Sequence, residues 1–434
     1  MTVETWSSHS NIRPADGSDR LVRDVLFLAT FLLIWVTANP FPDLADPKLL
    51  KPVGDGNLLG QSLTLLLTAS LGAFVLLKDD RLVLKAFSPL LLAALVWFAL
   101  SAGASPNAGL ASRRLLLSVF TLFQAAAFIQ LPLDRTHFAR LLTAAALIIL
   151  VLCYAGVFLA PGLSIHQSID VAEPELAGNW RGLFSHKNGA GAAMVVLIFV
   201  GIFVIRTFNV ALGALVIALA AVFLFFTESK SPIRLLPVVL AASYLIVRVR
   251  RPSLKFAVAA VIPLLINVLT VGTVLFAPID ALVGDLISDP TFTGRDVIWL
   301  FAVDHIAQRP FLGFGFQAFW GTSGLVSSWS YLESWGYRAS DAHNAYLNLG
   351  VMTGIVGLVL ALLWIFVQPL VDLVRTEPGR SDPALTTLFV QIWFFGLCVS
   401  GFESTLFDGG NSVWFMMIVS IIGIRYQATA QLSR

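Results

Sequence analysis

The sequence predicts an all-α integral membrane protein with about 12 transmembrane helices, and three observations lead to this fold class. Of the 434 residues, 57% are hydrophobic and 12% are charged, whereas a soluble globular protein carries roughly 25% charged residues. The apolar residues, among them 33 Phe and 11 Trp, gather in long runs. Many of these runs reach the roughly 20 residues that a helix needs to cross a bilayer. A water-soluble domain of this size could not bury so much apolar surface.

The apolar runs follow one another along the whole chain. They lie at about 23–39, 58–77, 86–102, 114–130, 138–160, 188–205, 209–227, 232–248, 255–277, 345–370, 384–403 and 410–425. The seventh and eighth runs are separated only by the short polar stretch 228–231. Residues 1–20 are polar and show neither an apolar segment nor a small-residue cleavage site. We therefore expect no cleavable signal peptide and a first helix that is retained as an anchor.

Lys and Arg in the short loops predict the orientation, because cytoplasmic loops carry an excess of them. If the spans alternate, the basic cluster at 248–255 falls on the same side as both termini, which are therefore expected in the cytoplasm. The predicted divisions are a cytoplasmic tail over 1–22, nine transmembrane helices over 23–277 with an outer loop over 161–187, a large outer loop over 278–344, three transmembrane helices over 345–425 and a cytoplasmic tail over 426–434.

The outer loop over 278–344 is long for a compact protein, and loops of this length are usually functional. Apolar residues recur at helical spacing over 295–308, which predicts a helix lying on the membrane surface or on other helices. Thr293 or Gly294 can cap its start, and Pro310 follows its end. The loop also carries several Trp and Tyr residues, whose flat faces can hold sugar rings or populate a membrane interface.

Several function classes are excluded or disfavoured by composition and motifs. The net charge of +2 and the scattered basic residues give no reason to expect a nucleic-acid partner. Cys153 and Cys398 each lie in an apolar run and are interpreted as small buried hydrophobes. No phosphate-binding Gly-Lys-Ser/Thr loop, no convincing metal spacing and no glycosidase-like carboxylate pair stands out. We expect no metal site and no cofactor.

Three polar contexts in the outer segments are candidates for chemistry. In the stretch 179–188, Arg181, His186, Lys187 and Asn188 precede a Gly- and Ala-rich helix start. The free N–H groups and positive dipole end of such a start attract phosphate. The alternative is that the glycines of this stretch simply let two helices pack closely.

The second and third contexts belong to the long outer loop. Arg295 opens the predicted surface helix, and its planar guanidinium suits a phosphate or pyrophosphate; it could instead pair with Asp296 or stack on Trp299. His343, followed by Asn344, stands where the loop enters a membrane helix, and histidine can hold a proton near neutral pH. Its alternative role is that of an anchor at headgroup level. Arg113 and Arg114 are further outer cations.

These contexts, in this order, resemble the family of bacterial O-antigen ligases and polysaccharide polymerases of the Wzy-C type. One family pattern, His-Asn, nine residues, Gly, two residues, Gly, is met by His343, Asn344, Gly354 and Gly357. A second is met by Gly294, Arg295, Trp299, Pro310, Leu312, Gly313 and Gly315. The Arg-Gly-x-Phe-x-His-Lys-Asn stretch at 181–188 looks closest to the exopolysaccharide polymerase branch. The resemblance covers roughly residues 100–424.

The resemblance implies a GT-C-like architecture and a metal-independent glycosyl transfer at the periplasmic face of the bacterial inner membrane. The donor would be an oligosaccharide on undecaprenyl pyrophosphate. The acceptor would be a sugar hydroxyl, on another lipid-linked repeat for a polymerase or on lipid A core for a ligase. A chain-length regulator protein is a candidate partner, and membrane lipids would surround the helices.

Residue roles follow as hypotheses. His343 would activate or orient the acceptor hydroxyl, and Arg181 and Arg295 would grip the pyrophosphate. Substrate-binding candidates are Arg113, Arg114, His186, Lys187, Asn188, Asn344 and Trp299. Polymerase is favoured over ligase, with protein O-glycosylation as a minor third option. A transporter or flippase is disfavoured, because transporters usually bury ionisable groups at mid-bilayer in repeated halves, and a purely structural scaffold would not need such a loop.

Overall fold

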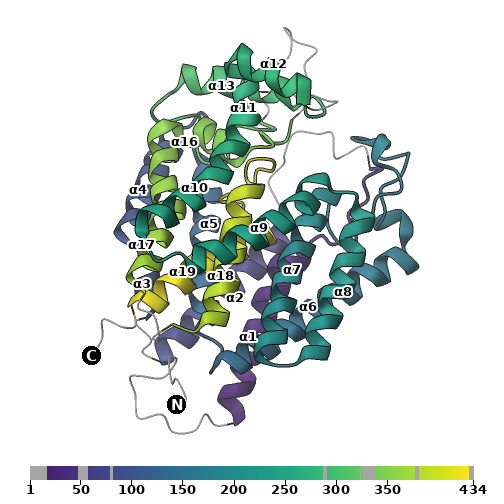
Figure 1. Ribbon diagram of the computed structural model, residues 1–434, viewed down its shortest axis with the longest axis vertical. Coiled ribbons are helices and arrows are strands. Elements are labelled where there is room, and N and C mark those ends of the chain that lie inside the picture. The colour runs from purple at the N-terminus through teal and green to yellow at the C-terminus, as the bar shows by residue number, and fades with distance from the viewer. Residues whose placement is uncertain are drawn as a thin grey trace.

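The computed structural model describes residues 17–46, 57–78, 82–286, 291–322, 325, 339–376 and 381–429. Apart from loops and one isolated bridge between Ile165 and Trp180, the described chain is helical. The helices are α1 (Gly17–Val36), α2 (Leu58–Leu77), α3 (Leu82–Ala86), α4 (Pro89–Gly103), α5 (Ala108–Phe128), α6 (Arg135–Leu159), α7 (Lys187–Thr207), α8 (Val210–Thr227), α9 (Lys230–Arg248), α10 (Pro252–Leu269), α11 (Val271–Leu275), α12 (Ala277–Leu286), α13 (Arg295–Gln308), α16 (Ala345–Leu362), α17 (Gln368–Arg375), α18 (Pro383–Val399) and α19 (Ser412–Thr429) (Figure 1).

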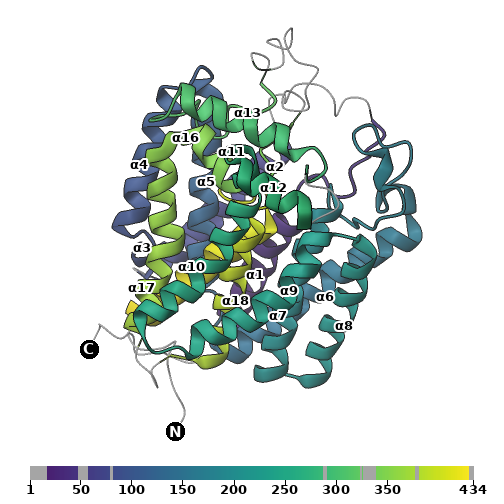
Figure 2. The same cartoon turned by 45° about the horizontal axis from the view of Figure 1, so that its top comes forward.

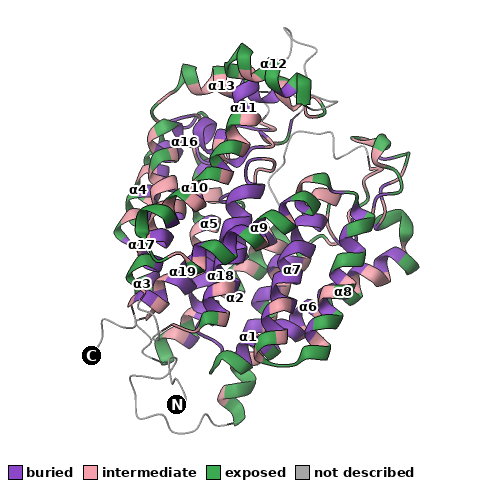
Figure 3. Ribbon diagram, in the orientation of Figure 1, coloured by how far each residue is buried: buried purple, intermediate pink, exposed green. Residues whose placement is uncertain are grey.

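The helix bundle is apolar on its outside as well as in its core. Within the described residues, eight helices are long and apolar enough to cross a membrane, and α4 and α18 are shorter apolar helices. In the most apolar 18-residue windows, 78% and 83% of the residues of α7 and α19 are buried, but 11% and 17% of those of α2 and α10. Figure 3 shows this contrast between α7, which is mostly buried, and α10, which is mostly intermediate or exposed. Apolar helices with so much exposed surface need lipid around them. The chain is therefore a multi-pass membrane protein, which confirms the predicted fold class.

Helix boundaries follow local backbone signals. The narrow break between the seventh and eighth apolar runs is present, because Glu228 adopts a left-handed conformation (φ 49°) that ends α8. The predicted surface helix is confirmed as α13, and Gly294 (φ 79°) is its N-cap residue. The apolar run 255–277 differs from the prediction, since it is divided between α10 and α11. At the division the Thr270 hydroxyl donates to the Ile266 carbonyl at 2.7 Å, a contact that bends helices.

The two ends of the bundle differ in character. At the end where α1 begins, Arg23 donates to the carbonyls of Gln130 and Leu131 at 3.2 and 3.1 Å, and Asp19 pairs with Lys78 at 2.7 Å. The start of α1 and the ends of α2 and α5 thus meet there. The opposite end carries α12 and α13, which lie across the bundle close to the start of α16 (Figures 1 and 2). The long connections therefore gather at one end.

Glycine shapes α16, the helix that follows the long loop over 278–344. Within α16, Gly354 has a φ of +70°, and a Cβ atom there would lie 1.9 Å from the carbonyl oxygen of Phe311. Next to it, the Ile355 N–H donates to the Pro310 carbonyl at 2.7 Å. The kink in α16 therefore receives the segment that follows α13. This docking explains why the sequence pattern pairs the Pro310 motif with a glycine in α16, and it fixes the entry of α16 relative to α13.

Candidate active site

Asn344 anchors the start of α16 and so sets the position of the residue before it. Its Oδ1 accepts from the N–H groups of Tyr346 and Leu347, each at 3.0 Å. Its Nδ2 donates to Asn267 Oδ1 at 3.0 Å and to the Gly401 carbonyl at 3.2 Å. The side chain is fully buried. The structure thus makes Asn344 a helix cap that ties the loop before α16 to the segment after α18.

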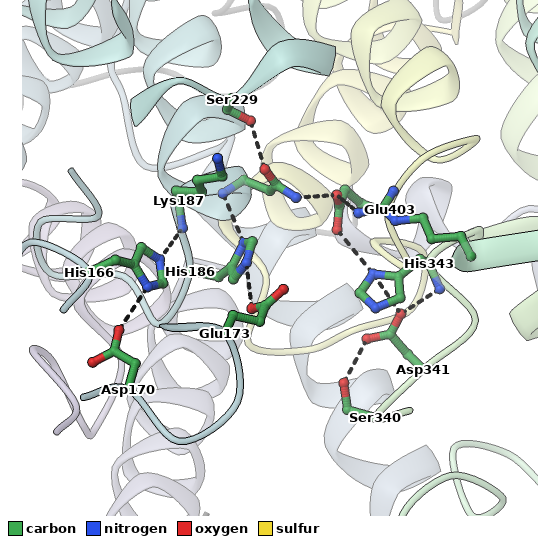
Figure 4. A network of polar contacts seen from close by, with 12 residues as sticks. His166, Asp170, Glu173, His186, Lys187, Ser229, Ser340, Asp341, His343 and Glu403 are labelled. Atoms are coloured by element: carbon green, nitrogen blue, oxygen red, sulfur yellow. Dashed lines mark hydrogen bonds and ion pairs between the residues drawn. The ribbon is translucent and has the colours of Figure 1, made fainter. Parts of the chain in front are cut away.

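His343 is held between two carboxylates. Its backbone has a φ of 45°, and its N–H donates to Asp341 Oδ1 at 2.7 Å. The Nδ1 atom lies 3.8 Å from both Asp341 Oδ1 and Glu403 Oε2 (Figure 4). This nitrogen is buried and has no hydrogen-bond partner among the described residues, while the side chain as a whole stays 31% exposed. The imidazole is therefore buried on its Nδ1 side and accessible elsewhere.

Glu403 joins the separate parts of the site, and the sequence reasoning missed it. Its Oε1 accepts from Asn188 Nδ2 at 2.8 Å and from Arg295 Nη2 at 3.1 Å, while Oε2 faces His343 (Figure 4). It lies in the segment 400–411 between α18 and α19. A signal was present, because Glu403 is the sole charged residue of the apolar run 384–403. Ionisable groups at such places usually have a functional partner.

Arg295 opens α13 and points to this same carboxylate. Besides Glu403, its guanidinium donates through Nη1 to the Phe402 carbonyl at 2.5 Å, and the side chain is 19% exposed. Trp299, one turn later, is fully buried and packs on Phe292 with ring centroids 5.2 Å apart. The structure therefore brings Arg295 to Glu403, the carboxylate that also faces His343. Trp299 is buried in the packing of α13.

The start of α7 supplies the other side of the network. Asn188 Oδ1 accepts from the Ser229 hydroxyl at 3.0 Å, so its amide bridges Ser229 and Glu403. His186 Nδ1 accepts from the Asn188 N–H at 3.1 Å, and His186 Nε2 pairs with Glu173 at 2.9 Å. These contacts orient the amide and join the 160–187 loop to the site (Figure 4).

Lys187 lies at the edge of this network. Its N–H donates to His166 Nε2 at 3.3 Å, and His166 Nδ1 pairs with Asp170 at 3.0 Å. The Asn179 amide is oriented so that its nitrogen donates to Glu228 Oε2 at 3.0 Å and its oxygen accepts from Lys187 Nζ at 2.8 Å. Lys187 is therefore held by groups of its own loop.

Arg181 occupies a different environment from Arg295. Its side chain is fully buried, and its guanidinium donates to the carbonyls of Phe184 at 3.0 Å and Pro42 at 2.7 Å. These bonds tie the 160–187 loop to the segment after α1. Within the described residues, Arg181 contacts neither Glu403 nor His343.

Arg113 and Arg114 line a cavity of about 320 Å³ between α1, α2 and α5. Arg114 donates to the Gln317 carbonyl, and Asp408 lies at the same cavity. Asp408 belongs to the segment 400–411, as Glu403 does. The two arginines therefore line a cavity that shares the segment 400–411 with the network.

The charged groups of the site shift one another's pKa values. Burial lowers the pKa of His343, but the carboxylates of Asp341 and Glu403 outweigh it and the pKa lies above its usual 6.5. Burial raises the pKa of Glu403, but Arg295 and His343 outweigh it, and the pKa falls to about 2. Near neutral pH, Glu403 is therefore ionised, and His343 can hold a proton at Nδ1 while its other nitrogen remains available.

Two sequence matches with known proteins bear on the family of the chain. Residues 215–362 match the sequence model of a family described as O-Antigen ligase (Wzy_C), a range that includes Arg295 and His343. The chain is also 26% identical over 125 residues to "Exopolysaccharide production protein ExoQ" of Rhizobium meliloti (strain 1021), a match that covers 28% of this chain and 29% of that protein. These two partial matches support the resemblance of the chain to O-antigen ligases and polysaccharide polymerases.

Proposed function

We propose that this protein polymerises oligosaccharide repeats carried on undecaprenyl pyrophosphate, at the periplasmic face of the bacterial inner membrane. One observation supports this most: Arg295, His343 and Glu403 come from three distant segments and meet at the end of the bundle that carries the long connections. A cation, a base and a carboxylate that positions both suit a transfer with a pyrophosphate leaving group.

The proposed reaction is a single displacement at the anomeric carbon of the donor sugar. The acceptor hydroxyl oxygen forms the new bond to that carbon, and the bond between the carbon and the pyrophosphate oxygen breaks. The electron pair leaves with the pyrophosphate, whose growing charge Arg295 stabilises. The hydroxyl proton passes to His343 Nε2, because the carboxylates beside Nδ1 favour keeping the other proton there. No metal ion is needed for this step.

The other predicted residues have supporting roles in this proposal. Asn188 holds Glu403 from the side of α7, and His186 accepts from the backbone N–H of Asn188. Asn344 holds the backbone that carries His343. Arg181 fixes the 160–187 loop from within. Apolar grooves between the helices would receive the prenyl chain, in contact with membrane lipids.

Polymerase is the first candidate and ligase the second. The similarity to a protein named for exopolysaccharide production favours a polymerase, whereas the matching family is described as O-Antigen ligase. The two reactions share donor and chemistry and differ in the acceptor, which is a lipid-linked repeat for a polymerase and lipid A core for a ligase.

The test uses purified full-length protein in liposomes with synthetic undecaprenyl-pyrophosphate-linked repeats, with and without lipid A core. A ladder of longer lipid-linked chains is the expected product. Transfer to lipid A core without a ladder would establish the ligase instead. If neither product forms from folded protein, glycosyl transfer is the wrong function. His305→Gln is a matched control, because His305 lies on α13 and donates from Nδ1 to the Phe301 carbonyl, outside the network.

A further inference from the structure

The cavity between α1, α2 and α5 is a second polar feature beside the transfer site. Its volume of about 320 Å³ is at the lower end of the range for small-molecule sites. It opens at the same end of the bundle as the network, because its lining includes the end of α1, the start of α2 and the segment 408–410. It therefore lies where a water-soluble group could enter without crossing the hydrocarbon core.

The lining suits a saccharide. Amides of Asn57, Gln61 and Gln317 and hydroxyls such as that of Thr64 surround the space. Each of these groups both donates and accepts hydrogen bonds, as sugar hydroxyls do. Apolar side chains, Leu33 among them, complete the wall and can cover the C–H face of a sugar ring.

The charge of the lining is unbalanced. Arg113 and Arg114 face the cavity together with one carboxylate, that of Asp408. The side chains of the cavity therefore carry a positive excess near neutral pH. Guanidinium groups bind carboxylates and phosphates in a planar, bidentate way, so the excess favours a saccharide that bears an acidic group.

Hydrogen bonds connect the cavity lining to the segment 400–411, which also carries Glu403. The Ser118 hydroxyl donates to the Phe407 carbonyl at 3.2 Å, and the Gln317 amide donates to the same carbonyl. Phe407 and Asp408 belong to the segment that also carries Glu403. Burial raises the pKa of Asp408, and the charge of Asp341 raises it further. Asp341 Oδ1 lies 3.8 Å from His343 Nδ1. A sugar in the cavity would therefore contact the segment that also carries Glu403, the partner of His343.

We propose that this cavity binds the end of the acceptor glycan, and that Arg113 and Arg114 select an acceptor with an acidic sugar. The inference rests on the proposed function, in which the acceptor hydroxyl must be held beside His343 while Arg295 holds the donor pyrophosphate on the other side. It assigns acceptor recognition to a surface separate from the donor site.

The experiment measures saccharide binding directly and then transfer. Full-length protein in nanodiscs is titrated by calorimetry with a glucuronate-containing disaccharide and with the same disaccharide after reduction of its carboxyl group. The variants are Arg113→Gln and Gln61→Leu, with Arg234→Gln as the matched control, because Arg234 is exposed on α9 and lies outside the cavity. Thermal melts establish that each variant is folded.

The wild type and Arg234→Gln should bind the acidic disaccharide at least about tenfold more tightly than the neutral one. Arg113→Gln should abolish that preference, and Gln61→Leu should weaken both. In the transfer assay, Arg113→Gln should raise the KM for the acceptor about tenfold or more and leave the KM for the donor unchanged.

Two results overturn the assignment: folded variants that bind both disaccharides as the wild type does, or an Arg113→Gln variant that loses affinity for the lipid pyrophosphate instead. Failure of the proposed function has a different signature. Cavity variants would then change saccharide binding as expected, while no protein, including the wild type, forms a transfer product.

Discussion

Replacing Glu403 with Gln tests the central contact of the site. The substitution keeps the size of the side chain and an oxygen that can accept from Arg295, but it removes the negative charge 3.8 Å from His343 Nδ1. The pKa of His343 should therefore fall, because one of the two carboxylates that raise it is lost.

The size of the effect follows from the geometry. Two unit charges about 4 Å apart attract by about 4 kcal/mol at an effective dielectric constant of about 20. At about 1.4 kcal/mol per pKa unit, this gives an upper bound of about three units. The His343 and Glu403 side chains are 31% and 20% exposed, so solvent screening reduces the effect and a fall of about one unit is expected. The loss of an orienting contact should also lower kcat by about 10²-fold.

The assay is the pH dependence of kcat/KM for glycan transfer, since its acidic limb reports the pKa of the base in the free enzyme. In the wild type, His343 acts as a base only when its Nε2 carries no proton. Activity should therefore rise with pH through a midpoint above 6.5. In Glu403→Gln that midpoint should move to lower pH. An unchanged midpoint, or one that moves to higher pH, would refute the pairing of Glu403 with His343.

Three further predictions concern stability, each measured by thermal unfolding in detergent. Gly354→Ala should destabilise the protein by more than about 2 kcal/mol, because residue 354 has a left-handed backbone and the new Cβ would clash with the Phe311 carbonyl. Gly189→Ala is the control and should be neutral or stabilising, because the space around its Cβ is open. Equal effects of the two substitutions would contradict the packing of the Phe311 segment against α16. Arg181→Gln should cost about 3 kcal/mol through lost charge-assisted bonds; a silent substitution would exclude an anchoring role. Because the pKa of Glu403 falls to about 2, its contribution is present above about pH 4.5 and lost as the pH falls to 2, so the difference in Tm between wild type and Glu403→Gln should shrink across that window, and a constant difference would show that the charge is not involved.

Local signals in the sequence predicted many of the helix boundaries. The break at Glu228 and the start of α13 at Arg295 follow from polar and glycine residues next to apolar runs, and the structure has both. Hydropathy also predicts which segments lie in the bundle. These features depend on neighbours along the chain, which a single sequence displays.

The partners within the site depend on contacts between distant segments, which a single sequence does not display. Arg295 and Glu403 are 108 residues apart, so the guanidinium could be predicted as a cation and its carboxylate partner could not. Arg181 and Arg295 look alike in sequence, since each follows or precedes glycine in an outer loop. In the structure, Arg181 is fully buried against backbone carbonyls, whereas Arg295 contacts Glu403. This difference arises from packing.

The most direct test of the account compares wild type and His343→Gln in the same liposomes, with an undecaprenyl-pyrophosphate-linked repeat as donor and acceptor. Both proteins should bind the donor equally, because Arg295 and Glu403 are intact. The wild type should form longer lipid-linked chains, and folded His343→Gln should lose about 10²–10⁴-fold in rate, the range for removal of one general base. Chain growth at the wild-type rate in His343→Gln would contradict the assignment of this site to glycan transfer.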